Sequence, residues 1–411
     1  MNDKRLKRRG TKNGKAVWTA RTPLPRAADG KRRTHRFTFV GTQKDAERAF
    51  VDALTRIEKG SFVATERTTF GQYIAEFLSR SKGTFALKTW ERFDQMARTH
   101  VVPKLGDIPL QKLRASHLND AYAAWRESGL SGQTVIHHHR FIHRTLAEAL
   151  REDRILQNVA ASATKPKAPR REMRFLGAEE IAKIFRAAEG TQYSPLIALA
   201  LATGARRGEL LGLKWGDVDF AGGAVAIRRS LEETKSGVAE KTPKSGKSRV
   251  VALTLGALET LRQHRLRVAD AQGIGRTAAT NYLFANDDGT AWRPHKVTEG
   301  FRRLARRAGI VPLPTRKRPT TRAGRRWPPE IKKTGALRRG GEITFHSLRH
   351  TCASMLLAQG VHPKVVQEML GHSTVSITMD LYSHTTPTLQ SDAVRRLDSI
   401  LRLPDAGSAT A

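Results

Sequence analysis

The residues with the clearest potential for chemistry lie in a helical stretch near the end of the chain. His346 and Arg349 stand three positions apart in an amphipathic run, a spacing that places an imidazole and a guanidinium on one face of a helix. A second histidine, His372, follows a glycine, and Tyr382 comes ten residues later. Basic groups together with a phenol suit a reaction centre that binds an anion and attacks it through tyrosine.

Each of these residues alone also has an ordinary structural explanation. A helical arginine is usually solvated or salt-bridged, and a tyrosine usually belongs to a core or an interface. Arg206 lies in TGARRGE, where one helix is expected to end and the next to begin, and Glu209 is its expected salt-bridge partner. Lys244 lies in PKSGKSR, a composition typical of a hairpin tip, where a lysine is usually solvated but can also donate a proton in a groove. The order of the whole set therefore carries more information than any member.

The charge of the chain points to a polyanionic partner. The 411 residues carry a formal net charge of +35, and the pI is near 11.1. Self-repulsion of this size opposes a compact state unless a polyanion neutralises it, and nucleic acid is the simplest such partner. A membrane surface fits less well, because no basic amphipathic helix with a Trp/Leu face stands out.

Several other classes of protein are disfavoured by what the sequence lacks. Cys352 is the single cysteine, which excludes intrachain disulfides and a cysteine cluster for zinc. The histidines at 137–139 and 143 include an i,i+4 pair, but no acidic residue at matching spacing completes a metal site, so a polar or DNA-facing surface is favoured. No apolar stretch follows the basic N-terminus and none is as long as a membrane span. We expect a cytoplasmic, nucleoid-associated protein with no metal or other cofactor.

The elements that must position these residues fall into several regions, the first of which is a basic module at 1–62. Its first 60 residues hold 17 basic and 6 acidic side chains. Strands are expected at 16–21 and 34–40, on either side of a turn, and a helix at 43–59. A basic sheet of this kind can lie in a DNA groove, although a small structural cap is the alternative. The candidate DNA-binding residues here are Arg32, Arg33 and Arg36.

The rest of the chain predicts a mainly α protein with small β-sheets. We expect a bundle of helices at 66–160 with a break near Pro103, a basic linker at 161–174, and a larger domain at 175–400 followed by a tail at 401–411. Within the larger domain, the segment 312–341 has ten basic residues, one acidic residue and five prolines. It cannot fold alone, and we interpret it as a basic insertion that orders on DNA phosphates.

Two short strands are expected in the larger domain, at 224–231 and 249–253. They flank a polar excursion at 232–248 that contains Lys244. Lys247 and Arg249, at the end of this excursion, are further candidates for DNA contact.

The series TGARRGE, PKSGKSR, HSLRH, LGH and a tyrosine ten residues later resembles that of the tyrosine recombinases, also called phage-type integrases. The motifs span 175–384, and the upstream regions resemble the family's helical core-binding domain and its arm-binding domain. HxLRH with LGH and tyrosine at these distances is a specific signal, whereas TGxRxxE alone is weak. The insertion at 312–341 is a departure, because the family is usually shorter there.

The resemblance implies that four residues bind the scissile phosphate. Arg206 and Arg349 would clamp its non-bridging oxygens, and His346 and His372 would hydrogen-bond it, with His346 also helping to deprotonate the nucleophile. A phosphodiester transition state concentrates negative charge on these oxygens, and without a metal the cationic donors must stabilise it.

The same resemblance assigns the bond-making and bond-breaking groups. Tyr382 would attack phosphorus to form a 3′-phosphotyrosine, and Lys244 would protonate the leaving 5′-oxygen. Lys235, Lys241 and Lys247 share the excursion, but PKSGKSR followed by the VVAL strand is the family's common form. Glu209 would orient the Arg206 loop. A covalent intermediate conserves bond energy, which agrees with the absence of a P-loop motif.

The implied activity is site-specific DNA recombination by the integrase of a phage or an integrative element. The implied partners are double-stranded DNA with att-type sites, three further protomers in a homotetramer, a host DNA-bending protein and a directionality factor. Two alternatives remain open: a type IB topoisomerase, which uses similar chemistry as a monomer, and a DNA-binding regulator with a dead active site.

Overall fold

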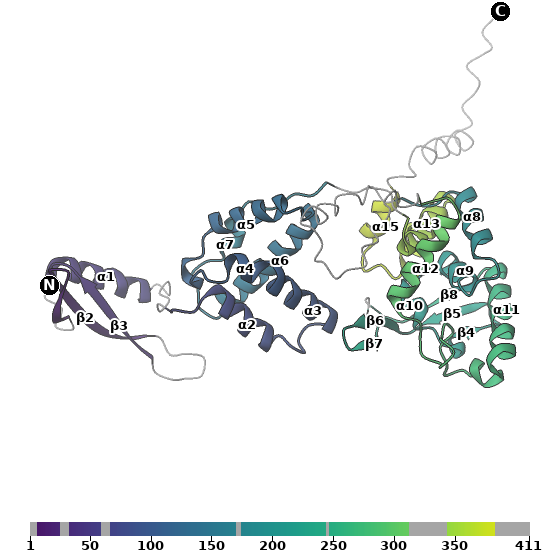
Figure 1. Cartoon of the computed structure of the whole chain (residues 1–411), viewed down its shortest axis with the longest axis horizontal. Helices are drawn as coiled ribbons and strands as arrows, with labels where there is room; N and C mark the ends of the chain where they lie inside the picture. The colour runs from purple at the N-terminus through teal and green to yellow at the C-terminus, as the bar shows by residue number, and fades with distance from the viewer. Residues whose placement is uncertain are drawn as a thin grey trace, which may run out of the picture. The chain divides into compact units, whose positions relative to one another are not determined.

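The computed structural model describes residues 6–24, 33–58, 66–169, 174–243, 246–311 and 343–382 (Figure 1). The chain divides into two compact units, and each is described by itself. The described residues are mostly helical with small antiparallel sheets, so the predicted α+β class is confirmed. No helix among them is long and apolar enough to cross a membrane.

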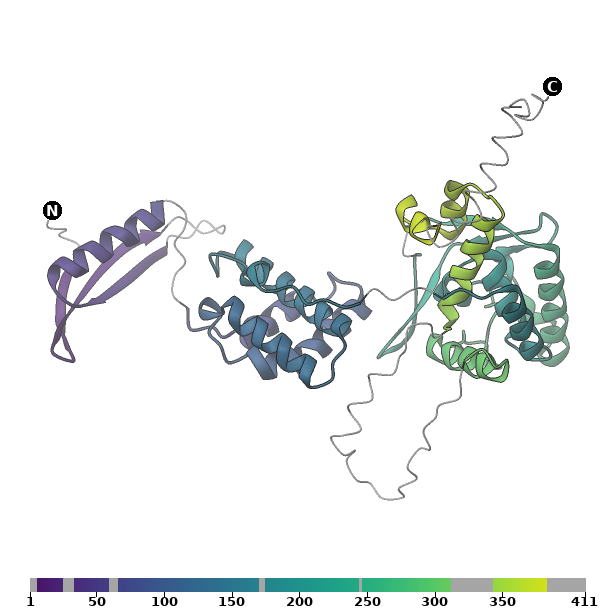
Figure 2. The ribbon, with the colours of Figure 1, turned by 90° about the horizontal axis from the view of Figure 1, so that it is seen from above.

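The N-terminal module of the first unit is a sheet covered by one helix. Its strands β1 (Lys7–Lys12), β2 (Lys15–Leu24) and β3 (Arg33–Val40) are antiparallel in that order, and α1 (Gln43–Glu58) packs on one face (Figures 1 and 2). The strand β1 was not predicted, because its residues KRRGTK are all exposed and show no apolar alternation.

The two faces of this sheet differ in character. Ala20 and Phe37 pair across β2 and β3 and pack with Phe50 of α1. The next pair in the register is Arg21 and Arg36, and both side chains are exposed. Because neighbouring residues of a strand point to opposite faces, the two arginines lie on the face away from α1.

The helical bundle of the first unit is built around four longer helices. These are α2 (Phe70–Arg80), α3 (Leu87–Met96), α5 (Ala115–Glu127) and α6 (Gly132–Arg151). Their apolar stripes meet in a core that includes the fully covered side chains of Tyr73, Leu118 and Phe141. Ser131 caps α6 as its sequence position predicts, since its hydroxyl accepts a hydrogen bond from the Thr134 amide at 3.2 Å.

The helical run does not break at Pro103. A π-helical turn at Ala97–Val101 continues α3 into α4 (Val102–Leu105), and the chain leaves the helix only at Gly106. The run therefore ends within the segment 103–107, where the sequence predicts its break. Pro103 is the second residue of α4, which follows directly on the π-helical turn, where the regular i to i−4 hydrogen-bond pattern is already interrupted.

Two of the clustered histidines are core residues. His138 and His139 are 1% and 6% exposed. The His138 Nδ1 lies 2.6 Å from the Thr134 carbonyl oxygen, and the His139 Nδ1 lies 2.9 Å from the Tyr122 hydroxyl. The interpretation of this run as a polar or DNA-facing surface was wrong for these two, because α6 is amphipathic and turns them inward.

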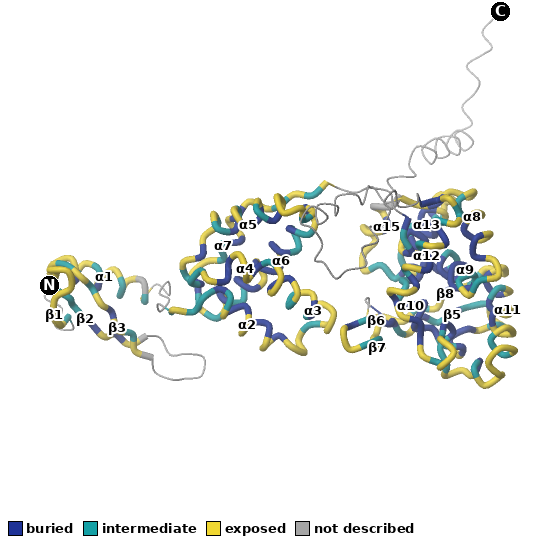
Figure 3. Tube along the Cα trace, in the orientation of Figure 1, coloured by how far each residue is buried: buried dark blue, intermediate teal, exposed yellow. Residues whose placement is uncertain are grey.

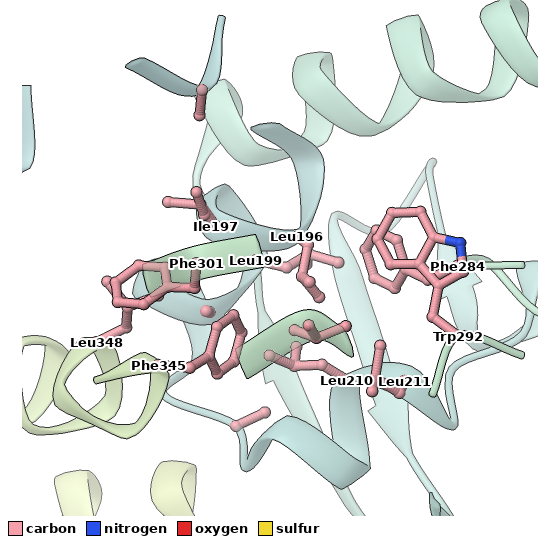
Figure 4. Packing of buried hydrophobic residues seen from close by; sticks show 14 of the residues in the cluster. Leu196, Ile197, Leu199, Leu210, Leu211, Phe284, Trp292, Phe301, Phe345 and Leu348 are labelled. Carbon is pink, nitrogen blue, oxygen red and sulfur yellow. The ribbon is translucent and has the colours of Figure 1, made fainter. Parts of the chain in front are cut away.

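The second unit has a helical core around the buried helix α9. Its helices are α8 (Ala178–Ala188), α9 (Ser194–Thr203), α10 (Arg207–Leu211), α11 (Leu255–Gln272), α12 (Pro294–Arg307), α13 (Phe345–Ala358), α14 (Pro363–Leu370) and α15 (Val375–Tyr382). Leu196 and Leu199 of α9 meet Phe301 of α12 and Phe345 of α13 in one apolar cluster (Figure 4), and α9 is covered along most of its length (Figure 3).

Two small sheets complete this unit. β4 (Val218–Asp219), β5 (Ala224–Ile227) and β8 (Arg249–Ala252) form one, and β6 (Ser230–Thr234) and β7 (Gly237–Lys241) form a hairpin. The single strand predicted at 224–231 is thus two strands, and the predicted polar excursion contains β7. The Lys241 ammonium lies 2.5 Å from the Glu232 carboxylate across this hairpin, so polar cross-strand pairs replace the apolar pattern that prediction relies on.

The start of the second unit is attached to α13. The Leu176 amide donates a hydrogen bond of 2.9 Å to the hydroxyl of Thr351, which is fully buried. Cys352, the next residue of α13, is buried as predicted.

Candidate active site

The site is built around the C-terminal turn of α14. Gly371 ends this helix with φ 68° and ψ 46°, a left-handed conformation that favours glycine. The last carbonyl groups of a helix have no partner within it and carry partial negative charge. This turn therefore presents backbone acceptors immediately before His372.

Three guanidinium groups occupy these acceptors. In chain order of the acceptors, Arg249 Nε donates to Met369 O at 2.8 Å, Arg349 Nη1 to Leu370 O at 2.8 Å, and Arg206 Nη2 to Gly371 O at 3.0 Å. Cations at a helix C-terminus are favoured by the helix dipole. Residues far apart in the sequence are thereby brought to one backbone turn.

A buried carboxylate holds two of the three arginines. Glu209 is 0% exposed, and it accepts hydrogen bonds from the Arg206 amide at 2.9 Å, from Arg206 Nη1 at 2.8 Å and from Arg249 Nη2 at 2.6 Å. Burial alone would raise the pKa of this carboxyl, but the hydrogen bonds and charges of Arg249, and then of Arg206, lower it below its ordinary value. Glu209 is therefore ionised at neutral pH.

Arg349 is the most deeply buried of the guanidiniums. It is 4% exposed, and its Nη1 also donates to the Gly204 carbonyl at 2.7 Å. Desolvation and then the charge of Arg206 lower the pKa of Arg349 to about 9, so the group remains cationic at neutral pH. Its Nη2 has no hydrogen-bond partner among the described residues, and a buried donor in this state favours binding of an anion.

Two histidines adjoin the arginines. His346, in the first turn of α13, is exposed at its edge, and its ring lies 4.7 Å from that of His350. Desolvation by surrounding protein, followed by the charges of His350 and Arg349, lowers the pKa of His346 to about 4. His372 is half-buried, and desolvation and Arg349 lower its pKa to about 4 as well. Both imidazoles are neutral at pH 7 without a bound anion.

The arrangement combines fixed cations with neutral imidazoles. Guanidinium groups bind phosphate oxygens through paired N–H donors, and a neutral imidazole can accept a proton. The His372 Nδ1 lies 2.9 Å from the hydroxyl of Thr378 on α15, which leaves its Nε2 as the nitrogen available to a ligand. The site can therefore bind a tetrahedral anion and assist a proton transfer beside it.

The structure brings together most of the residues that the sequence singled out. Arg206, Glu209, His346, Arg349 and His372 surround this turn. Lys244 and Arg32 lie outside the described residues. Tyr382 is the last residue of α15 and Arg33 the first of β3, and the side chains of both are not described. Lys247 and Arg36 are exposed.

Three residues of the site were given another role or none by sequence reasoning. Arg249 was predicted to contact DNA, but its side chain is 10% exposed and its guanidinium faces Glu209 and Met369. His350 and Thr378 were not considered. No residue pattern in the sequence pointed to these roles of Arg249 and Thr378, because both depend on contacts made in the folded chain.

Comparison with known proteins assigns the family. Residues 174–388, more than half of the chain, match the profile of the phage integrase family, and residues 69–126 match its N-terminal SAM-like domain. A tyrosine recombinase XerC-like protein of Caldanaerobacter subterraneus subsp. tengcongensis is 26% identical over 95% of this chain and 97% of its own length. An integrase of Streptomyces ambofaciens is 27% identical over 92% of each chain.

Solved structures show the same fold. The Tn1549 transposon integrase in complex with a circular intermediate DNA superposes with a TM-score of 0.63 at 21% identity, over 80% of this chain and 99% of that one. A lambda integrase tetramer bound to a Holliday junction gives a TM-score of 0.54 at 18% identity, over 92% and 95%. The chain thus belongs to the phage integrase family, and it is a tyrosine-type site-specific DNA recombinase.

Proposed function

We propose that this recombinase cleaves an att-type DNA site by attack of the Tyr382 hydroxyl on the scissile phosphorus. A bond forms between the phenolic oxygen and phosphorus, and the bond from phosphorus to the 5′-oxygen breaks. The 3′ end remains on the protein as a phosphotyrosine, and Lys244 gives the proton that the 5′-oxygen needs to leave as a hydroxyl. Attack by a 5′-hydroxyl of the partner DNA reverses these steps and reseals the strand.

The observation that supports this proposal is the convergence of guanidinium and imidazole groups on one turn. Arg206 and Arg349 would give their donors to the non-bridging oxygens, where charge develops in the transition state. In other enzymes, removal of one such preorganised donor costs roughly 2.7–4 kcal/mol of transition-state stabilisation. Glu209 is ionised beside Arg206 and would keep that guanidinium in the orientation that the phosphate needs.

The histidines fit the proton transfers. With a pKa near 4, His346 is neutral at pH 7 and can accept the phenolic proton as Tyr382 attacks. His372 would donate from Nε2 to a phosphate oxygen while its Nδ1 is held by Thr378. A bound phosphate would raise the pKa of both imidazoles, because an anion stabilises their charged forms.

DNA binding outside the site would involve the N-terminal module. The cross-strand pair Arg21 and Arg36 lies on the open face of the sheet, and like charges placed opposite each other destabilise a sheet that has no counter-charge. DNA phosphates would supply it. We further propose that four protomers act on two att-type sites of a phage or integrative element, with a host bending protein and a directionality factor as accessory partners.

The test is formation of a covalent adduct. The protein is incubated with a nicked suicide substrate carrying its att-type core site, and the products are resolved on a denaturing gel. Wild-type protein should give a band of protein linked to DNA, and this band should migrate faster after protease digestion. Tyr382→Phe should bind the same DNA without giving the band. Binding by the wild type without any band would favour a regulator with a dead site.

Plasmid relaxation separates the remaining alternative. A type IB topoisomerase would relax supercoiled plasmids that lack any att-type site, whereas a site-specific recombinase requires the site. Relaxation of both plasmids at equal rates would overturn the assignment of sequence specificity while leaving the phosphotyrosine chemistry intact.

A further inference from the structure

We propose that Arg249 is a positioning residue for cleavage: it holds Arg206 and the turn that carries His372 in one arrangement, and it does not itself hold DNA. This inference rests on the proposed function of the site. It also replaces the DNA contact that the sequence predicted for Arg249 with a different role.

The guanidinium of Arg249 is held within the protein on two sides. Its Nε donates to the Met369 carbonyl oxygen at 2.8 Å, and its Nη2 donates to Glu209 Oε2 at 2.6 Å. The side chain is 10% exposed, and its Nη1 is buried without a hydrogen-bond partner among the described residues. Two of its three guanidinium nitrogens therefore donate to protein acceptors, and one of these acceptors is the carboxylate that also binds Arg206.

One of these contacts leads to Arg206. The carboxylate that Arg249 binds also accepts two hydrogen bonds from Arg206, one from its backbone amide and one from Nη1. The hydrogen bond and charge of Arg249 are the largest of the effects that lower the pKa of Glu209 against the opposing effect of burial. Loss of Arg249 would leave a buried carboxylate with Arg206 alone, and Arg206 would be drawn toward it.

The other contact leads to His372. Met369 lies three residues before His372 at the C-terminal end of α14, and a Cβ atom at Gly371 would lie 2.9 Å from Arg249 Nη1. The turn and the guanidinium are therefore in close contact, so that a shift of one displaces the other. Arg249 is also the first residue of β8, five positions after Lys244, so it fixes where the segment carrying the proposed acid rejoins the sheet.

The experiment compares cleavage with binding in variants of the full chain. Arg249→Met keeps an unbranched side chain but removes all donors, and we expect adduct formation at saturating protein to fall about 100-fold. The Kd for the same core-site DNA should change by less than about threefold, because the lost interaction acts in the transition state. Arg249→Lys restores the charge but cannot span both acceptors, so it should recover only part of the rate.

A double-mutant cycle identifies the route. If Arg249 acts through Glu209, the double variant with Arg249→Met and Glu209→Gln should form the adduct only slightly more slowly than the slower of the two single variants. Each substitution then breaks the same interaction, so their effects do not multiply. Arg229→Met is the matched control, since Arg229 also bridges two carboxylates, those of Asp217 at 2.5 Å and Glu240 at 3.4 Å, in the same unit. It should leave the adduct rate within about threefold of wild type.

Three results would overturn the proposal. Weaker binding with an unchanged rate at saturation would mean that Arg249 holds DNA. Multiplying losses in the double variant would mean that it acts independently of Glu209. A rate that falls only with the folded fraction, measured by thermal denaturation of the same samples, would make it merely structural. Absence of an adduct with wild-type protein is a different outcome, because it overturns the proposed function itself.

Discussion

At the scale of single residues, the site holds positively charged side chains close together against their mutual repulsion. Arg349 and Arg206 repel each other, and burial makes the repulsion stronger, yet backbone carbonyls and Glu209 hold both in place. The carbonyl oxygens of Leu370 and Gly371 each accept a hydrogen bond from one of these two guanidinium groups. The fold therefore supplies the free energy that holds like charges together without DNA. Catalysis by preorganised groups requires such an arrangement.

Arg349→Lys tests this arrangement directly. A lysine keeps the charge, but one ammonium cannot reproduce a planar fork that donates to Gly204 and Leu370 and still offers Nη2 to a phosphate. We expect adduct formation to fall by about 10²–10³-fold and the free energy of unfolding to fall by about 1–3 kcal/mol. Single-turnover cleavage and urea denaturation measure the two effects.

Arg262→Lys is the control for that substitution. Arg262 is half exposed and pairs only weakly with Glu259 at 3.6 Å, so neither the rate nor the stability should change appreciably. A cleavage rate for Arg349→Lys close to that of this control would contradict the role proposed for the fork.

The lowered pKa of His372 predicts an acid-sensitive fold. The pKa is 6.5 for an ordinary histidine and about 4 here, so the unfolded chain binds more protons than the folded one between these values. The free energy of unfolding should therefore fall as the pH drops from about 6.5 toward 4. His372→Asn, which keeps a hydrogen-bonding group near Thr378, should lose less stability over this interval.

Denaturation midpoints of the wild type and of His372→Asn at pH 7.5, 6.0 and 5.0 measure this difference in stability. The titration of other groups affects both proteins equally and cancels in the comparison. The effect of His346 should be smaller, because its exposed edge is screened by solvent. Parallel curves for wild type and variant would show that His372 is protonated equally in both states.

At the scale of elements, two left-handed glycines set the distance between helices at the site. Gly204 ends α9 with φ 58°, and a Cβ there would lie 2.2 Å from Leu370 Cδ2, in the last turn of α14. Gly371 ends α14 itself. The close approach of these two helix ends allows Arg349 to donate to Gly204 and Leu370 with one nitrogen.

Gly204→Ala should therefore be more harmful than its backbone angle alone implies. Gly190 has a similar φ of 67° but nothing within 4 Å of an added Cβ, so Gly190→Ala reports the conformational cost, about 1–2 kcal/mol. We expect Gly204→Ala to cost a further 1–3 kcal/mol, roughly, because Leu370 must move. Urea denaturation measures the free energy of unfolding of both variants. Equal losses would mean that α14 can move away from the added methyl group without a free-energy cost.

The elements themselves were largely predictable, whereas their convergence was not. The helical character of the bundle and the order of the motifs around Arg349 were visible in the sequence. The strands β1 and β7 were missed because polar pairs, not apolar alternation, hold them. The meeting of Arg206 with Gly371, 165 positions later, uses a backbone carbonyl that no residue pattern reveals. For the same reason the hydrogen bond from Arg249 to the Met369 carbonyl was not foreseen.

At the scale of the whole molecule, the charge of +35 must be neutralised in several places at once. The N-terminal sheet offers one of them. Exchanging Arg21 and Arg36 for alanine should reduce the dependence of DNA affinity on salt, with the log–log slope falling by about 0.9 for each phosphate that the protein no longer binds. Deletion of residues 1–60 should reduce it further.

Arg48→Ala provides the comparison for this experiment. Arg48 is exposed on α1, which covers the opposite face of the sheet, and its removal should leave the slope nearly unchanged. Binding isotherms at several salt concentrations give the slopes. An unaltered slope after removal of both sheet arginines would mean that this face does not meet phosphate.

The hydrogen bond from Leu176 to Thr351 carries a mechanical consequence. Leu176 is among the first residues after the basic linker, and Thr351 lies only two positions beyond Arg349 on α13. Tension on the linker would therefore act on α13 through this hydrogen bond, together with the Arg174–Glu180 ion pair and the apolar packing of Leu176. The helix that carries His346 and Arg349 is consequently one of the places where a pull from the preceding region acts.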